Sequence, residues 1–171
     1  MRKLFDLDKK DYGQCTSEFV RNAARSIVIK AGKVAMIHSL KYDYYKFPGG
    51  GIEKDETPIE AMIRETLEEV GLVVKPETVH EYGFVHRVQR SWFDPSQKYI
   101  QDNYYYLCEV EDTLSEQDLV DYEADEGFTL EWVEPNQAIK TNREKHHGPK
   151  DALMIEREAR VLEMLLNEGL V

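Results

Sequence analysis

Apolar and polar residues alternate with the period of a β-strand in several segments of this chain. Phe128, Leu130 and Trp132 alternate with polar residues, as expected for a strand with one buried face. Other runs rich in β-branched and aromatic residues predict strands at Ser26–Ile29, Val34–His38, Tyr44–Phe47, Val73–Val74, Tyr82–Arg90 and Tyr99–Val110. Lys30–Lys33 and Ser91–Gln97 have the composition of turns between them. Residues 1–17 are polar and predict an N-terminal arm or an edge strand.

Helical spacing of apolar residues predicts three helices. One covers Pro58–Val70, and a short one runs from Pro135 to about Lys140. The last, Lys150–Glu168, places apolar side chains on one face, namely Ala152, Ile155, Ala159, Leu162 and Leu166. We expect this helix to pack on the face of the sheet away from the Pro58–Val70 helix. Strands interspersed with helices predict an α/β fold in which a mixed β-sheet lies between helices.

The Pro58–Val70 helix has well-marked ends. Thr57 is suited to the N-cap and Pro58 to the first helical position. Glu60 follows Thr57 by three residues and completes the pattern of a capping box. Gly71 stands where helices often end in a left-handed residue.

The side chains of this helix sort onto two faces when each residue is rotated by about 100°. Glu65, Glu68 and Glu69 share one face at spacings i, i+3 and i+4, and could hold a hard divalent cation. Arg64 lies one turn before Glu68 and could orient it through a charge-assisted hydrogen bond. A glycine-rich turn, Pro48–Gly51, leads into the helix. The opposite face gathers the apolar residues and Thr66, namely Ile59, Met62, Ile63, Thr66, Leu67 and Val70. The alternative interpretation is an amphipathic helix with a solvated acidic face.

The segment Gly50–Leu72 resembles the signature of the Nudix hydrolases. That signature reads G, five residues, E, seven residues, R-E-U-x-E-E-x-G-U, where U is a bulky aliphatic residue. The matching positions are Gly50, Glu56, Arg64, Glu65, Thr66, Leu67, Glu68, Glu69, Val70, Gly71 and Leu72. The single departure is Thr66 at the first U position, where its branched side chain is expected to preserve the packing. The resemblance implies a Nudix-type α/β/α sandwich, and we expect residues 1–171 to form one such domain.

The resemblance also implies a reaction, the Mg²⁺-dependent hydrolysis of a diphosphate linkage in a nucleoside diphosphate joined to another moiety. Mn²⁺ is the alternative cation, and carboxylates suit both because these ions prefer oxygen ligands. By analogy with the family, the metal ligands would be Glu65, Glu68, Glu69 and the carbonyl group of Gly49. Family members often use a further glutamate as a base or ligand. Glu126 is the candidate here and Glu123 its competitor, so the base stays open between Glu65 and Glu126.

Composition narrows the choice of partners. A chain of 171 residues fits one domain, and its net charge of −11 argues against a nonspecific grip on long nucleic acid. Cys15 and Cys108 are far apart and resemble ordinary reduced thiols. Neither a signal peptide nor a membrane span is recognisable, so we expect a soluble, cytoplasmic protein. The resemblance adds a homodimer as one oligomeric option.

The sequence gives weaker signals of substrate recognition than of the reaction. Basic residues that could reach phosphate groups are Arg21, Arg25, Lys46, Arg87 and Arg90, although each alone also fits an ordinary surface charge. Trp92 lies in a predicted loop and could stack on a base. We favour Arg21, Lys46, Arg90 and Trp92 as substrate-binding residues. Nucleoside triphosphates, dinucleoside polyphosphates and sugar nucleotides all remain candidate substrates.

The chief alternative to an enzyme is a nucleotide-binding sensor domain that kept the fold and lost turnover. The complete set of carboxylates, together with Arg64, favours the enzyme, since a domain that only binds has less need of every one of them.

Overall fold

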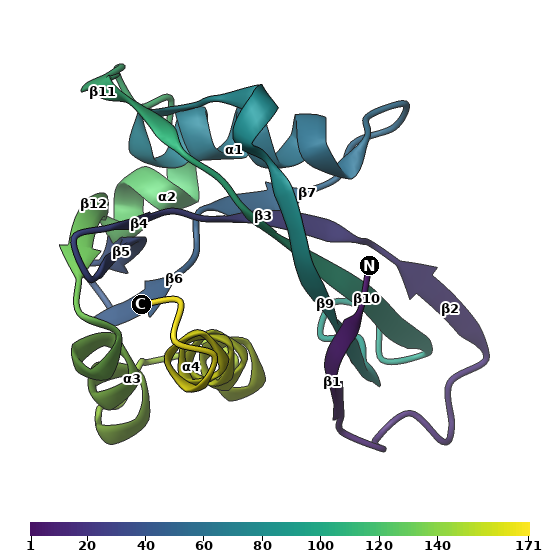
Figure 1. Cartoon of the computed structure of the whole chain (residues 1–171). Helices are drawn as coiled ribbons and strands as arrows, with labels where there is room; N and C mark the ends of the chain where they lie inside the picture. The colour runs from purple at the N-terminus through teal and green to yellow at the C-terminus, as the bar shows by residue number, and fades with distance from the viewer.

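Helices cover both sides of a twisted β-sheet in the computed structural model, which describes the whole chain, residues 1–171. The helix α1 (Pro58–Val70) lies on one side, and α3 (Pro135–Glu144) and α4 (Ala152–Asn167) lie on the other (Figure 1). This arrangement confirms the predicted α/β/α sandwich. It also confirms that the last helix packs away from α1. None of the helices combines the length and the hydrophobicity that crossing a lipid bilayer requires.

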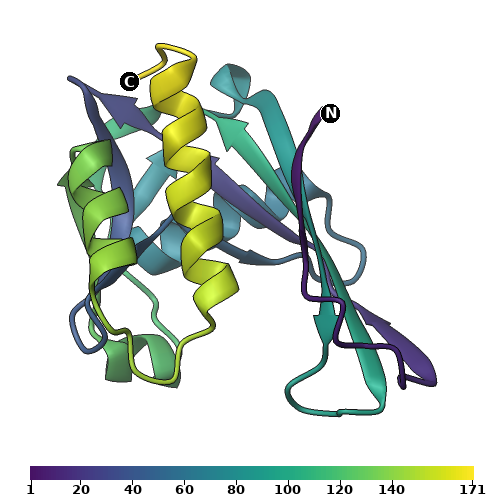
Figure 2. The same ribbon diagram turned by 90° about the horizontal axis from the view of Figure 1, so that it is seen from below.

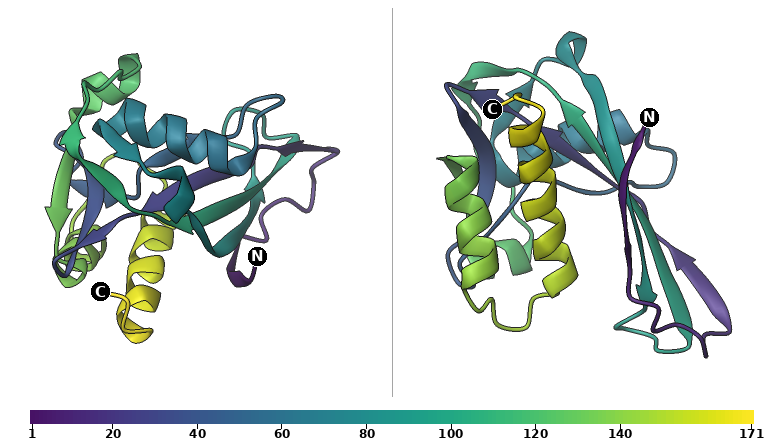
Figure 3. Two further views of the ribbon diagram at one scale, coloured as in Figure 1. Left: turned by 45° about the horizontal axis from the view of Figure 1, so that its top comes forward. Right: turned by 60° about the horizontal axis from the view of Figure 1, so that its bottom comes forward.

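The main sheet has six strands and is mixed. Its strands are β1 (Lys3–Asp8), β9 (His80–Arg90), β10 (Gln97–Leu107), β3 (Ala23–Ile27) and β7 (Gly49–Gly51), in that spatial order, with β2 (Ser17–Val20) also paired to β10. β1 runs parallel to β9, and β2 and β3 run parallel to β10, whereas β9–β10 and β3–β7 are antiparallel. β1 lies at the edge of this sheet, within the N-terminal residues for which an arm or an edge strand was predicted. β9 and β10 form a long hairpin that projects beyond the helices (Figures 2 and 3).

Two smaller sheets complete the fold beside the mixed main sheet. One contains β12 (Phe128–Val133), β5 (Lys33–Ser39), β4 (Ile29–Lys30) and β6 (Tyr44–Lys46), and the other pairs β8 (Leu72–Val74) with β11 (Val110–Leu114). The sheets separate because the chain changes partners at short interruptions. Val28 divides β3 from β4, and the pairing passes there from β10 to β5. The predicted strand Tyr99–Val110 likewise stops at Leu107 and resumes as β11 against β8.

Two hydrophobic clusters hold the helices to the strands. The first buries Val161, Leu162 and Leu165 of α4 against the sheet, and the second buries Ala61, Met62 and Val70 of α1. A short helix, α2 (Asp121–Glu126), lies before β12 and was not predicted. It has no apolar stripe in its sequence, since four of its six residues are acidic.

α4 also supports the glycine-rich turn that precedes α1. The backbone N–H of Phe47 donates to Glu158 Oε2 at 3.1 Å, and both residues are fully buried. Arg157 pairs with the other oxygen of Glu158, and its Nη1 donates to Asn103 Oδ1 at 2.7 Å. Burial by itself would raise the pKa of Glu158, but Arg157 and Arg25 outweigh burial and hold that pKa below its usual value. The turn is therefore tied to the core through an ionised carboxylate.

This buried carboxylate gives the fold a pH dependence. Because the folded pKa of Glu158 is lowered, its contribution to stability is present above the ordinary value of 4.5 and is lost as the pH falls below it. We expect Glu158→Gln to lose about 3 kcal/mol of unfolding free energy at neutral pH, since Arg157 is left buried without its partner. Urea unfolding at several pH values should then show a smaller acid-induced loss for the variant than for the wild type. Parallel pH curves would contradict this assignment.

Candidate active site

The predicted caps of α1 are present in the structure. Thr57 Oγ1 accepts a hydrogen bond from the N–H of Glu60 at 3.2 Å, and Glu60 Oε2 accepts one from the N–H of Thr57 at 2.8 Å. Gly71 ends the helix with a left-handed φ of 69°. These bonds fix where the helix begins, and therefore which of its side chains face the preceding glycine-rich turn.

Arg64 is the centre of the polar network on α1. Its guanidinium donates to both oxygens of Glu56, at 2.9 and 3.0 Å, and to Glu65 Oε1 at 2.8 Å. It also makes the predicted bond to Glu68 Oε2, at 3.1 Å, and a longer one to the carbonyl of Gly51, at 3.3 Å. The hydrogen bonds from Arg64 hold the pKa of Glu56 below its usual range despite partial burial. Three carboxylates thus share one cation.

The role of Glu56 within this network was not predicted. The residue stands at a fixed position of the motif, so a signal existed, but its spacing from Arg64 does not place the two on neighbouring turns of one helix. Glu56 lies before α1, where the N–H of Glu53 donates to it at 3.0 Å. Its contact with Arg64 fastens the loop to the helix.

Gly50 provides the surface on which the Glu65 carboxylate rests. A Cβ atom at residue 50 would come within 2.4 Å of Glu65 Cδ and Oε2. Only a residue without a side chain therefore lets this carboxylate lie against the turn.

Substitutions of the two neighbouring glycines should separate a change in the site from a change in the fold. In Gly50→Ala the new methyl group meets the flexible end of Glu65, so we expect this carboxylate to move and the fold to remain. In Gly49→Ala the methyl group would meet the backbone oxygen of Ala24 at 2.1 Å, from a residue whose φ is +136°. We expect Gly49→Ala to unfold at a clearly lower temperature, and Gly50→Ala to melt near the wild type while losing activity. Thermal melts and turnover with a nucleotide substrate test the pair, and equal melting points would contradict this reading of the turn.

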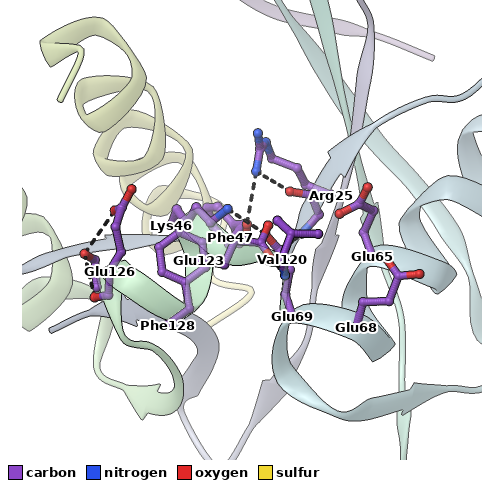
Figure 4. A network of polar contacts seen from close by, with 12 residues as sticks. Arg25, Lys46, Phe47, Glu65, Glu68, Glu69, Val120, Glu123, Glu126 and Phe128 are labelled. Atoms are coloured by element: carbon purple, nitrogen blue, oxygen red, sulfur yellow. Dashed lines mark hydrogen bonds and ion pairs between the residues drawn. The ribbon is translucent and has the colours of Figure 1, made fainter. Parts of the chain in front are cut away.

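Glu69 does not lie on an open acidic face, which corrects the interpretation of the helix as two simple faces. Its side chain is buried, with 1% of its surface exposed. Lys46 Nζ donates to Glu69 Oε1 at 2.7 Å and the N–H of Gly49 donates to Glu69 Oε2 at 2.7 Å (Figure 4). Burial raises the pKa of Glu69, although Lys46, the Gly49 amide and Arg25 oppose that rise. Conversely, Ile59 and Leu67, which were assigned to the apolar face, are exposed.

Glu126 lies apart from the glutamates of α1. Figure 4 places it on the far side of Lys46 and Phe128 from Glu65 and Glu68. Its side chain is buried and accepts from Tyr44 Oη at 3.0 Å and from Ser39 Oγ at 3.3 Å, while Lys150 pairs with the other oxygen.

Its competitor Glu123 is buried on the same short helix. It accepts from Tyr122 Oη at 2.8 Å and from the N–H of Val120 at 3.1 Å. Neither Glu123 nor Glu126 joins the Arg64 network, so the structure does not bring the predicted fourth carboxylate to α1.

The candidate substrate-binding residues are scattered. Lys46 is buried against Glu69, with its Nζ atom 4.5 Å from the centre of the Phe128 ring. Arg21 is exposed. It lies beside Gly51, since a Cβ atom at residue 51 would be 2.9 Å from Arg21 Nε. Arg90 is exposed at the end of β9, and Trp92 is 64% exposed in the turn of the hairpin. The four residues therefore do not form one pocket, although Lys46 and Arg21 lie close to the glycine-rich turn.

The donor set of α1 fits a divalent cation that is held by few carboxylates. Nowhere in the structure do three histidine, cysteine or carboxylate side chains converge as a ready-made metal site. Mg²⁺ does not need such a cage, since it binds proteins through one or two carboxylates together with water and substrate phosphates. Glu65 and Glu68 supply two partly exposed carboxylates beside the turn, and each has one oxygen without a hydrogen bond to the protein.

Comparison with known proteins agrees with this geometry. The family model described as the NUDIX domain matches residues 20–155, which is most of the chain. The chain belongs to the Nudix family. This membership confirms the resemblance inferred from Gly50–Leu72, and the matched region extends well beyond that motif.

Relatives by sequence match a shorter stretch of the chain. An RNA pyrophosphohydrolase of Xylella fastidiosa (strain M12) is 40% identical over 62 residues, which cover 36% of this chain and 32% of the relative. One of Xanthomonas campestris pv. campestris (strain B100) is 40% identical over 65 residues, or 38% of this chain and 31% of the relative. The chain thus spans about a third of the length of these curated relatives.

Solved structures share the Nudix fold over nearly the whole chain. A NUDIX hydrolase from Nitrosomonas europaea superposes with a TM-score of 0.61 at 15% identity, covering 88% of this chain and 90% of the other. A putative nudix hydrolase family member from Chromobacterium violaceum gives a TM-score of 0.54 at 17% identity, covering 90% and 82%. At these identities the likeness concerns the fold alone.

Proposed function

We propose that the protein is a divalent-metal-dependent pyrophosphohydrolase that cleaves the diphosphate linkage of a nucleoside diphosphate joined to another moiety. The observation that carries the proposal is the Arg64 network, in which one guanidinium holds the carboxylates of Glu56, Glu65 and Glu68 beside the glycine-rich turn. Family membership supports the same reaction class. Mg²⁺ is the proposed cation and Mn²⁺ the alternative.

The reaction requires neutralisation of phosphate oxygens and an activated water. A bound Mg²⁺ ion supplies both, because it screens the phosphate charge and lowers the pKa of a coordinated water. Glu68 would hold the cation through its free oxygen, together with water and substrate phosphates, and Arg64 positions the carboxylates of Glu65 and Glu68. We propose that Glu69 acts from its buried position by fixing Lys46 and the Gly49 amide. The carbonyl group of Gly49 remains a proposed ligand, although Arg25 Nη1 already donates to it at 3.0 Å.

The proton acceptor is better assigned to Glu65 than to Glu126. Both oxygens of Glu126 are engaged, one by Lys150 and the other by Tyr44 and Ser39. Glu65 has a free oxygen and lies against the turn. We therefore propose Glu65 as the base and Glu126 as a residue that fixes the loop carrying Lys150.

A nucleotide screen with product identification tests this function. The panel should contain nucleoside triphosphates, dinucleoside polyphosphates, sugar nucleotides and, because of the named relatives, a 5′-triphosphorylated oligonucleotide. We expect Mg²⁺-dependent release of a phosphorylated product from at least one of them. A compound that raises the melting temperature while no compound turns over would favour the sensor domain instead. A cytoplasmic location and a homodimer stay predictions.

A further inference from the structure

Part of one face of the main sheet is polar, beside Val85 and Tyr105 of the hydrophobic core on the same face. At the buried alternate positions of β9 and β10 stand Arg87, Gln89, Tyr99, Gln101 and Asn103. The strand register sets Gln101 opposite Arg87 and Tyr99 opposite Gln89. The polar side chains are therefore neighbours across the strands, and α4 borders them through the bond from Arg157 to Asn103.

Positive charge is in excess on this face. Arg157 pairs with Glu158 and Arg87 pairs with Asp151, whereas Nη1 of Arg25 finds only the backbone carbonyls of Phe47 and Gly49, at 3.1 and 3.0 Å. Burial raises the pKa of Tyr99, and four nearby arginines oppose that rise, namely Arg87, Arg157, Arg21 and Arg25. Four guanidinium groups thus face three carboxylates, Glu69, Asp151 and Glu158, on a chain whose net charge is −11.

Two of these guanidinium groups have donors without acceptors. The Nε atoms of Arg25 and Arg87 are buried and have no hydrogen-bond partner. Their side chains are more than nine-tenths buried, with exposed fractions of 8% and 4%. Buried donors are nearly always paired in proteins, because leaving one unpaired forfeits its hydration. An anion whose oxygens reached these donors would supply the missing acceptors.

The position of these residues connects the face to the candidate active site. Arg25 pairs with Gly49 across β3 and β7, and Figure 4 draws it beside Glu65 and Glu69. At the other end Arg87 lies 5.9 Å from the ring centre of Trp92, which is itself largely exposed in the hairpin turn. We use the name arginine face for the buried polar cluster of Arg25, Arg87, Tyr99 and Gln101 on this side of the sheet. It extends from Arg25, opposite Gly49 on β7, to Arg87, which lies near Trp92 in the turn of the β9–β10 hairpin.

We propose that the arginine face binds a phosphate group of the substrate that is not the one attacked beside α1. Guanidinium groups suit this task because their paired N–H donors match phosphate oxygens. The inference rests on the proposed function and narrows its substrate class. Nucleotides with a further phosphate beyond the scissile linkage, such as nucleoside triphosphates and dinucleoside polyphosphates, are bound in preference to sugar nucleotides with a neutral sugar.

Binding of inorganic pyrophosphate without metal tests the face separately from catalysis. Calorimetric titration in the presence of a chelator should show binding to the wild type. The double variant Arg87→Gln/Asp151→Asn removes the cation together with its partner and should bind at least about tenfold more weakly, since one charge-assisted interaction is lost. Lys98→Gln is the matched control, because Lys98 is next to Tyr99 on β10 and pairs with Glu18 on the opposite face.

If the double variant does not fold, Arg87→Lys provides a second variant for the same titration. It keeps the charge beside Asp151 but cannot offer two parallel donors, so pyrophosphate binding should weaken at least about threefold. Thermal melts establish that each variant is folded. Absence of metal-free binding to the wild type, or equal binding by the folded Arg87 variants, overturns the proposal.

Turnover measurements then distinguish failure of this subsite from failure of the proposed function. In the Arg87 variants KM should rise for a nucleoside triphosphate and stay unchanged for a sugar nucleotide. Mg²⁺-dependent turnover by a protein that does not bind pyrophosphate without metal would overturn the arginine face and leave the proposed function standing. If pyrophosphate binding depends on Arg87 but no nucleotide is turned over, the arginine face would stand and the proposed function would be overturned.

Discussion

Glu68→Gln is expected to lower kcat about 100-fold with Mg²⁺, equivalent to about 2.7 kcal/mol of activation free energy. The substitution removes a negative charge beside the glycine-rich turn without changing the volume of the side chain. Stability should fall by no more than about 1 kcal/mol, because Glu68 is partly exposed and Arg64 keeps its bonds to Glu56 and Glu65. Steady-state turnover and thermal melts of the same preparations provide the measurement.

The control for Glu68→Gln is Glu111→Gln. Glu111 is exposed on β11, away from the Arg64 network, so its substitution removes the same charge from a remote surface. Turnover of Glu111→Gln should equal that of the wild type. Near-normal turnover of a folded Glu68→Gln variant would remove Glu68 from the proposed metal ligands.

Glu69→Gln should affect stability as well as activity. Its carboxylate is buried in an ion pair with Lys46, and breaking such a pair on one side leaves an uncompensated charge. We expect a loss of about 3 kcal/mol in the free energy of unfolding, measured by urea denaturation. Turnover should fall too, because Lys46 and the Gly49 amide lose the group that positions them.

A double-mutant cycle separates the ion pair from other effects of Glu69→Gln. Lys46→Met/Glu69→Gln removes both charges, so its loss of stability should be smaller than the sum of the two single losses. Additive losses would mean that the 2.7 Å contact contributes no coupling free energy.

Local signals in the sequence predicted α1 well. Its first and last residues, its capping box and its left-handed Gly71 depend on neighbours within a few residues, and all are present. The bond from Arg64 to Glu68 was also predictable, because residues four apart in a helix face each other. The division of the helix into an apolar and an acidic face was less reliable. Helical rotation predicts the direction in which the Glu69 side chain points. It cannot predict that this side chain meets Lys46, which lies 23 residues earlier in the chain.

The remaining parts of the site depend on contacts between distant segments. Glu126 belongs to a separate network because Tyr44 and Lys150 reach it from other elements. The arginine face needs the register of β9 with β10 and of β3 with β10, together with the approach of α4. The positions of these basic residues in the sequence do not predict that they come together in the fold.

The sequence by itself determined the family, the α/β/α architecture and the helix that presents Arg64, Glu65 and Glu68, since the fixed spacing of the motif and short-range capping encode them. Only the tertiary structure decided which carboxylates stay available. Burial and ion pairing engage Glu69 and Glu126, whereas Glu65 and Glu68 remain partly exposed beside the turn. The physical reason is that desolvation and charge pairing act through space, between residues that the chain order keeps far apart.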